Sequence, residues 1–180
     1  MSYLVIQQGL MQIVWFACVL GAARGIPWLG TTIGLAFIAF HLTRSSSRLA
    51  HEAGVIAGTG AIGAAVDVFL LQSGTVAYTS GLWLPGFGPH WMVVLWMAFG
   101  ATLNVAHRWL HGRWLVAALL GAVFGPLSYL AGARLGGVAF PLSAEQGMVA
   151  LALTWLIAMP AAVALAARLA EPLQVAPARP

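Results

Sequence analysis

Asp67 is the residue of this chain best placed to do chemistry, because it is the only acid that lies well inside a long apolar segment. An aspartate at the centre of a membrane helix costs roughly 2.5–3.5 kcal/mol on insertion scales, so its carboxyl group must be protonated, paired or hydrated. Arg24 and Arg134 end apolar segments on the same predicted side, and Tyr129 lies at a similar depth. We predict that these four residues form an outer polar cluster, which either ties two helices together or serves as a proton or ligand site.

A second group of polar residues is predicted in the opposite half of the membrane. Its first members follow the i, i+3, i+4, i+7 spacing of one helical face, and they are Asn104, His107, Arg108 and His111. Gln8 and Gln12, one turn apart in the first apolar segment, complete the group. We predict an inner polar cluster of Asn104, His107, Gln8 and Gln12, which either makes hydrogen bonds between helices or binds a ligand.

The two clusters are predicted to lie in separate layers. Asp67 is about 6 Å from the outer end of its segment at Leu71, whereas Asn104 is about 20 Å from the outer end of its own segment at Trp91. The difference, roughly 14 Å, is several times the length of a hydrogen bond. The sequence therefore predicts two sites, not one.

Known catalytic and metal motifs are missing from the sequence. His107 and His111 have the i, i+4 spacing of a helical metal-binding pair, but no glutamate follows His107, so the zinc-protease motif is not formed. Residues 58–63 match the letters of a dinucleotide fingerprint, yet they lie inside an apolar segment with no preceding strand. We expect no metal site and no cofactor, and we assign no catalytic residue.

The elements that hold these residues are membrane helices. The 8 basic and 4 acidic residues make up 7% of the chain and apolar residues make up 61%, whereas about a quarter of a soluble domain is charged. Apolar stretches near the length of about 20 residues that spans a bilayer recur at 3–23, 27–42, 53–71, 91–110, 114–133 and 145–169. We predict an all-α, polytopic membrane protein: a six-transmembrane-helix bundle in one domain, 1–170, with a disordered tail, 171–180.

Small residues predict how these helices associate. Thr59, Gly60, Gly63 and Ala64 lie on the same helical face as Asp67. Inside a membrane, apolar burial does not drive helices together, so close contact between small residues must do so. We therefore expect this face, and Asp67 with it, to point into the bundle.

The arginines predict the orientation of the chain. The predicted side of the two termini carries six of them (Arg44, Arg48, Arg108, Arg113, Arg168 and Arg179), and the other side carries Arg24 and Arg134. Positive residues remain on the cytoplasmic side, so we predict a multi-pass protein of the bacterial inner membrane with both termini in the cytoplasm. The net charge of +4 does not indicate a nucleic-acid partner, because the basic residues form no patch with interleaved aromatic residues.

Several stretches of the chain resemble a bacterial family of small six-helix integral membrane proteins of unknown function. They are Trp15–Ala23, Val66–Asp67, Leu95–Trp96, Thr102–Asn104 and Gly125–Tyr129 with Gly132. The resemblance covers roughly residues 3–169. Members of that family lie beside genes similar to cyclopropane-fatty-acid synthases and to photo-oxidative stress functions, which implies membrane-lipid modification or protection. It carries over no catalytic residue.

Three functions fit these features. The leading hypothesis is a membrane protein that holds a lipophilic ligand or lipid in a cavity of the bundle, with a polar cluster binding the head group. The second is a substrate-binding subunit of an energy-coupling-factor-type transporter. The third is an intramembrane lipid-modifying enzyme that uses Asp67 or His107 as acid or base. The expected partners are membrane lipids and either a second copy of the chain or another membrane subunit.

Overall fold

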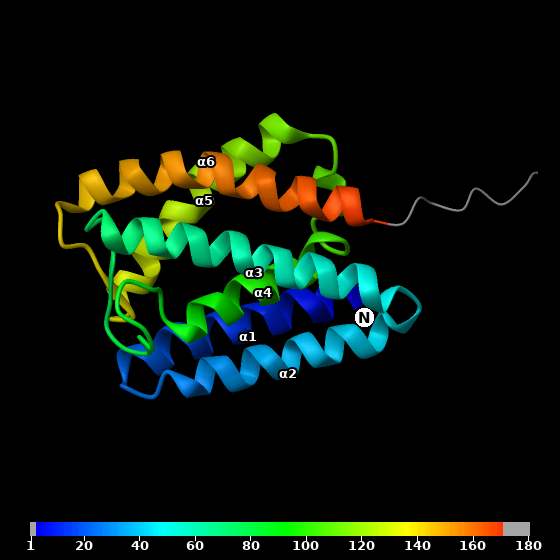
Figure 1. Ribbon diagram of the computed structural model, residues 1–180, viewed down its shortest axis with the longest axis horizontal. Helices are drawn as coiled ribbons and strands as arrows, with labels where there is room; N and C mark the ends of the chain where they lie inside the picture. Colours follow the sequence, from blue (N-terminus) through cyan, green and yellow to red (C-terminus); the bar gives the residue numbers. More distant parts are fainter. Residues whose placement is uncertain (1–2, 171–180) are drawn as a thin grey trace, which may run out of the picture.

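The computed structural model describes residues 3–170, apart from the side chain of Ser47, and this part of the chain folds into six α-helices (Figure 1). They are α1 (Tyr3–Ala23), α2 (Trp28–Arg44), α3 (Leu49–Gln72), α4 (His90–Leu103), α5 (Trp114–Arg134) and α6 (Ala144–Leu169). Single 3₁₀ turns occur at Ser46–Arg48 and Arg108–Leu110. The predicted all-α class is confirmed. The predicted disordered tail, 171–180, which contains Arg179, lies outside the described residues.

Four of the helices, α1, α3, α5 and α6, are long and apolar enough to cross a membrane. With 17 residues α2 lies at the short limit of a membrane span, and α4 has only 14. Large apolar side chains cover the outside of the bundle, as at Leu115 and Ile157, which are 73% and 72% exposed. Soluble proteins rarely expose apolar surface on this scale, so these faces are suited to lipid and indicate a membrane protein.

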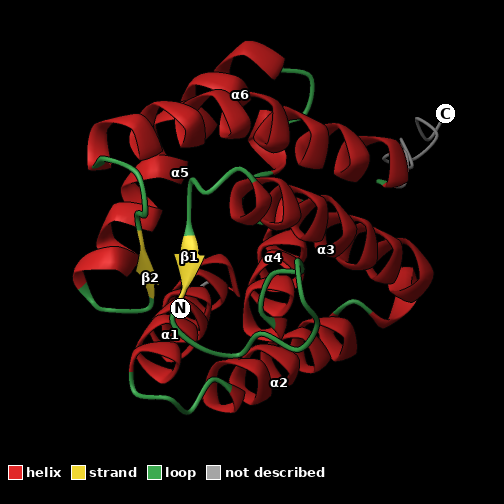
Figure 2. Cartoon of the chain, turned by 60° about the vertical axis from the view of Figure 1, so that its left-hand side comes forward, coloured by secondary structure: helices red, strands yellow, loops and turns green. Residues whose placement is uncertain are grey.

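The short helix α4 is the centre of the bundle. Helices α1, α2, α3 and α6 all pack against it, whereas α5 packs mainly on α6 (Figure 1, Figure 2). Ten of its 14 residues are buried. The chain therefore surrounds its shortest helix with its longer ones.

Small residues allow α3 and α4 to approach closely, as the sequence predicted. A Cβ atom on Gly63 of α3 would overlap the Trp96 indole of α4. In return, a Cβ atom on Gly100 of α4 would lie 2.9 Å from the Cβ atom of Thr59. Side chains of one helix thus fill the space that glycines leave on the other. This close packing holds the helices together in a membrane, where apolar burial does not drive association.

The fourth helix is shorter than the predicted segment, 91–110. It ends at Leu103 because Thr102 draws the chain into a turn: its carbonyl accepts the backbone N–H groups of residues 105–107, and its hydroxyl donates to the Phe99 carbonyl at 2.7 Å. In a regular helix the N–H groups of residues 105 and 107 would bond the carbonyls of residues 101 and 103, so the ladder is broken here. The prediction of one continuous helical face is therefore wrong for Asn104, His107, Arg108 and His111.

Two short strands join the connections at the end of the bundle away from the start of α1, which is called the outer end after the predicted orientation, the opposite end being called the inner end. β1 (Ala77–Tyr78), between α3 and α4, pairs antiparallel with β2 (Val138–Ala139), between α5 and α6 (Figure 2). In this register Tyr78 lies opposite Val138. The pairing holds Tyr78 at the end of α3, close to Asp67.

Candidate functional site

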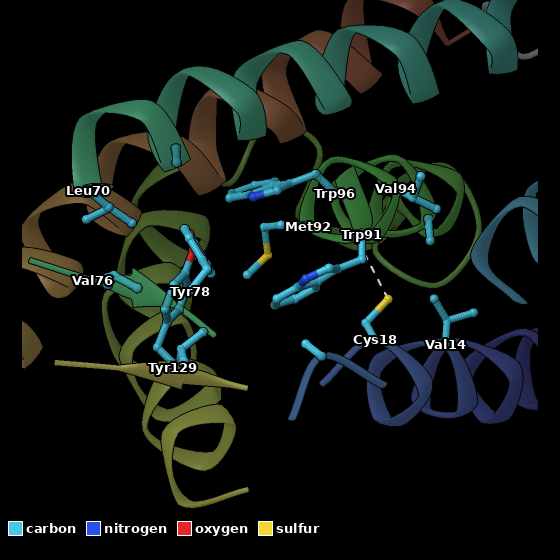
Figure 3. Packing of buried hydrophobic residues seen from close by; sticks show 14 of the residues in the cluster. Val14, Cys18, Leu70, Val76, Tyr78, Trp91, Met92, Val94, Trp96 and Tyr129 are labelled. Carbon is cyan, nitrogen blue, oxygen red and sulfur yellow. Dashed lines mark hydrogen bonds between the residues drawn. The ribbon is translucent and has the colours of Figure 1, made fainter. Parts of the chain in front are cut away.

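A groove of about 920 Å³ lies between α1 and α5, near the upper end of the usual range for ligand sites, roughly 300–1,000 Å³. Its floor is α4, from which Trp91, Met92 and Trp96 project toward Tyr129 of α5 (Figure 3). A hydrogen bond crosses the groove from α1 to α5: the Trp15 indole N–H donates to Ser128 Oγ at 3.0 Å.

The back wall of the groove is a pair of stacked indoles. The rings of Trp96 and Trp155 lie 4.6 Å apart at 15°. Trp155 of α6 reaches this place because Gly125 of α5 has no side chain, and a Cβ atom there would overlap the indole. The Gly121/Gly125 spacing therefore packs α5 on α6 and also shapes the wall.

The mouth of the groove is apolar and faces outward. Val5, Trp109 and Phe124 line it, and each is more than half exposed. In a membrane, such side chains contact lipid tails, so the groove opens toward the lipid side of the bundle.

Polar side chains are few in the groove. Gln8, Gln12, His107 and Ser128 line it, together with Tyr129, and no lining residue in the described part of the chain carries a formal charge. An apolar cavity with a small number of polar groups is the usual form of a site for a lipophilic ligand.

His107 lines this groove and has one ring nitrogen without a hydrogen bond among the described residues. Its Nδ1 lies 3.0 Å from Thr102 Oγ1, whose own hydrogen is donated to the Phe99 carbonyl. Thr102 must then accept, so Nδ1 carries the proton and Nε2 is an acceptor in the neutral ring. Because His107 follows the end of α4, it lies outside the spanning helices, and burial lowers its pKa from the ordinary value, which favours this neutral form.

Asp67 is fully buried between two tyrosines. The hydroxyls of Tyr78 and Tyr129 both donate to its Oδ1, at 2.6 and 2.9 Å. Its Oδ2 has no hydrogen-bond partner among the described residues. Asp67 therefore lies in the bundle interior and links α3 to α5 and to β1. Tyr129 also lines the groove, so this cluster touches the outer end of the cavity.

Arg24 and Arg134, the other predicted partners of Asp67, are placed elsewhere. Both side chains are exposed, and no hydrogen bond or ion pair between either arginine and Asp67 is present in the described part of the chain. The structure thus brings only Tyr129 of the three candidates to the carboxyl group and adds Tyr78, which the sequence did not point to.

At the inner end, a buried carboxylate organises a second network. Glu52 Oε2 lies 3.1 Å from His41 Nε2, and Glu52 Oε1 accepts from the Asn104 amide at 3.1 Å. His41 Nδ1 lies within hydrogen-bond distance of both Tyr3 and Gln7. Because Nδ1 takes these contacts, the proton of the neutral ring is on Nε2 and points at Glu52.

The predicted inner cluster is divided between this network and the groove. Asn104 belongs to the Glu52 network, whereas His107, Gln8 and Gln12 line the groove. The buried glutamine in the network is Gln7, whose Nε2 also donates to the Ala101 carbonyl at 2.9 Å. Both networks are anchored on α3, where Glu52 and Asp67 are separated by 15 residues, or about 22 Å of helix.

Comparison with known proteins places the chain in one family. The sequence profile described as "Protein of unknown function (DUF2878)" matches residues 4–161. The chain belongs to the DUF2878 family. The match covers all of α2 to α5 and most of α1 and α6 of the DUF2878 chain. No curated protein and no solved structure matches it.

The predicted segment, 53–71, left Glu52 outside the helix of this DUF2878 protein, although the sequence contained a signal for its inclusion. The small-residue face of α3 extends backward from Thr59 by seven residues, which is two helical turns, to Glu52. The buried residues of α3 follow that stripe from Glu52 to Leu70. The polar sequence just before Glu52 led to its assignment to a connection.

Proposed function

We propose that this protein holds a lipid or another lipophilic molecule in the groove between α1 and α5. The observation that carries the proposal is the groove itself: about 920 Å³, walled by indoles and aliphatic side chains, and open toward the lipid side. A molecule that enters it exchanges one apolar surrounding for another and gains close packing and a few polar contacts.

The proposal includes a link to membrane-lipid modification or stress, which the resemblance of the sequence implies. Fixed aromatic walls favour storage or presentation of a molecule over rapid transport. Within the described residues the groove contains His107 as its one histidine and no carboxylate, so binding is better supported than acid–base chemistry.

Filling the groove is expected to abolish binding. Gly9 lines the groove, and a Cβ atom there would meet nothing within 4 Å, so Gly9→Phe places a ring in open space. We expect native mass spectrometry of gently extracted protein to detect a bound lipid, and Gly9→Phe to reduce its occupancy at least about fivefold. Ala36→Phe, at an exposed position of α2, is the matched control and should keep the lipid.

The wild-type protein without any bound lipid would contradict the proposal, as would retention of the lipid by Gly9→Phe. A stable dimer that Gly9→Phe dissociates would show that a second copy occupies the groove, and this too would overturn the proposal.

We also propose that the protein lies in the bacterial inner membrane with both termini in the cytoplasm. Arg48 and Arg108 lie around one small recess together with Leu169 at the end of α6. At the other end, Arg24 directly follows α1 and Arg134 ends α5. The concentration of arginine beside the termini supports this direction. Fusions to the N-terminus test it: a green fluorescent protein should be fluorescent and an alkaline phosphatase inactive. An active phosphatase would reverse the orientation.

A further inference from the structure

The polar groups of the groove indicate which kind of lipid it takes. We propose, on the basis of the function proposed above, that the groove holds an uncharged lipid whose head group donates a hydroxyl or N–H hydrogen bond to His107 Nε2. Three observations carry this inference: the charge of the lining, the hydrogen bonds of His107, and the level at which the polar groups lie.

The lining excludes a charged head group. None of the described residues that line the groove is Asp, Glu, Lys or Arg. A phosphate or carboxylate inside it would be taken out of water without a counter-charge, which is costly. Arg108 follows His107 in sequence, but it borders the separate recess beside Glu52. An anionic phospholipid head therefore finds no counter-charge among the described residues of the groove.

The hydrogen bonds that His107 makes within the protein favour a head group that donates a hydrogen bond to it. Thr102 gives its only hydrogen to the Phe99 carbonyl and receives the Nδ1 proton of His107. Within the described residues, the His107 ring has hydrogen bonds only to Thr102, and the one whose ring atom is known uses Nδ1. The ring is held against Phe99, with the two centroids 5.6 Å apart. A fixed ring with its acceptor nitrogen free is complementary to a hydroxyl or amide N–H group and not to an ether or ester.

Two of the polar groups, Gln8 and His107, lie at the same end of the groove. Gln7 of α1 donates to the Ala101 carbonyl, which fixes the adjacent Gln8 near the level of Thr102 and hence of His107. From Gln8 to Val19 the groove follows α1 for 11 residues, or about 17 Å. The head group would lie between His107 and Gln8, and an apolar tail would extend outward over the floor formed by α4.

Three probes that differ only at the head test the inference: oleyl alcohol, its methyl ether and oleate. The alcohol can donate, the ether cannot, and oleate is anionic at neutral pH. By native mass spectrometry titration of the full chain in a mild nonionic detergent, we expect the alcohol to bind about fivefold more tightly than the ether, the ratio that one net hydrogen bond gives. Oleate should bind more weakly than the alcohol.

Variants of His107 assign the preference to this residue. His107→Phe keeps a ring beside Phe99 but has no acceptor, so the alcohol and the ether should bind equally. His107→Gln offers an amide oxygen and should keep part of the preference, which separates the loss of the acceptor from a loss of folding. Equal binding of all three probes to the wild type, or tightest binding of oleate, would overturn the inference while the proposed function stands. Binding of none of them would contradict both.

Discussion

Replacing His41 with leucine is expected to lower the free energy of unfolding by about 3 kcal/mol or more, because it leaves the Glu52 carboxylate buried without its main partner. His41 is fully buried and Glu52 is 4% exposed, and their polar atoms are 3.1 Å apart. The same change removes the group that Tyr3 and Gln7 contact. Three polar side chains therefore lose a partner through one substitution.

Unfolding of the purified protein in mixed micelles, followed by circular dichroism, measures this effect. Thr32→Leu, at an exposed position of the same helix, should change the free energy by less than about 0.5 kcal/mol. Adding Glu52→Gln to His41→Leu should restore part of the stability, because a buried neutral amide without a partner costs less free energy than a buried carboxylate. If His41→Leu costs less than about 1 kcal/mol, the network does not stabilise the inner end of the bundle.

The second large effect is expected at Gly30, where α2 packs closely against the backbone of α1. A Cβ atom on Gly30 would overlap the Cα atom of Cys18 and would lie 2.7 Å from its Sγ and 2.8 Å from its backbone nitrogen. Backbone atoms cannot rotate away as a side chain does, so α1 and α2 must separate. We expect Gly30→Ala to cost about 1–3 kcal/mol of unfolding free energy, which is the usual cost of overpacking.

Gly9→Ala is the matched comparison on α1. Its new methyl group meets nothing within 4 Å, and alanine is the better helix former by roughly 0.5–1 kcal/mol, so this variant should be as stable as the wild type or more so. The same unfolding assay compares the two alanine variants. Equal stabilities would show that close contact at Gly30 does not determine how α1 and α2 pack.

The sequence allowed the helices to be predicted because the evidence for them is local. Apolar stretches separated by short polar ones gave six helices with most ends within a few residues, and the small residues around Gly63 gave the face of α3 that packs inward. The early end of α4 was not predictable in this way. It depends on how Thr102 shares its carbonyl and hydroxyl, which no periodicity records.

The partners within the polar clusters were harder to predict, because they depend both on how each helix is rotated and on how deep each residue lies in the bundle. The sequence placed Asp67 in the interior and proposed Tyr129. Tyr78 is held near the carboxyl group by the pairing of two short strands, in which its partner, Val138, lies 60 positions later in the chain. Gln7 was passed over for Gln8 and Gln12, although a rotation of about 100° separates neighbouring positions on a helix. Depth alone could not decide which glutamine faces His41.

The central position of α4 also bears on how the chain is made. At about 21 Å, this helix is shorter than the hydrocarbon core of roughly 30 Å, so on its own it is too short to span the membrane. Three of its four neighbours, α1, α2 and α3, precede it in the chain. During synthesis they have already left the ribosome when α4 emerges, and only α6 is still to come. The order of helices thus gives the shortest helix a surface to pack against as soon as it is synthesised.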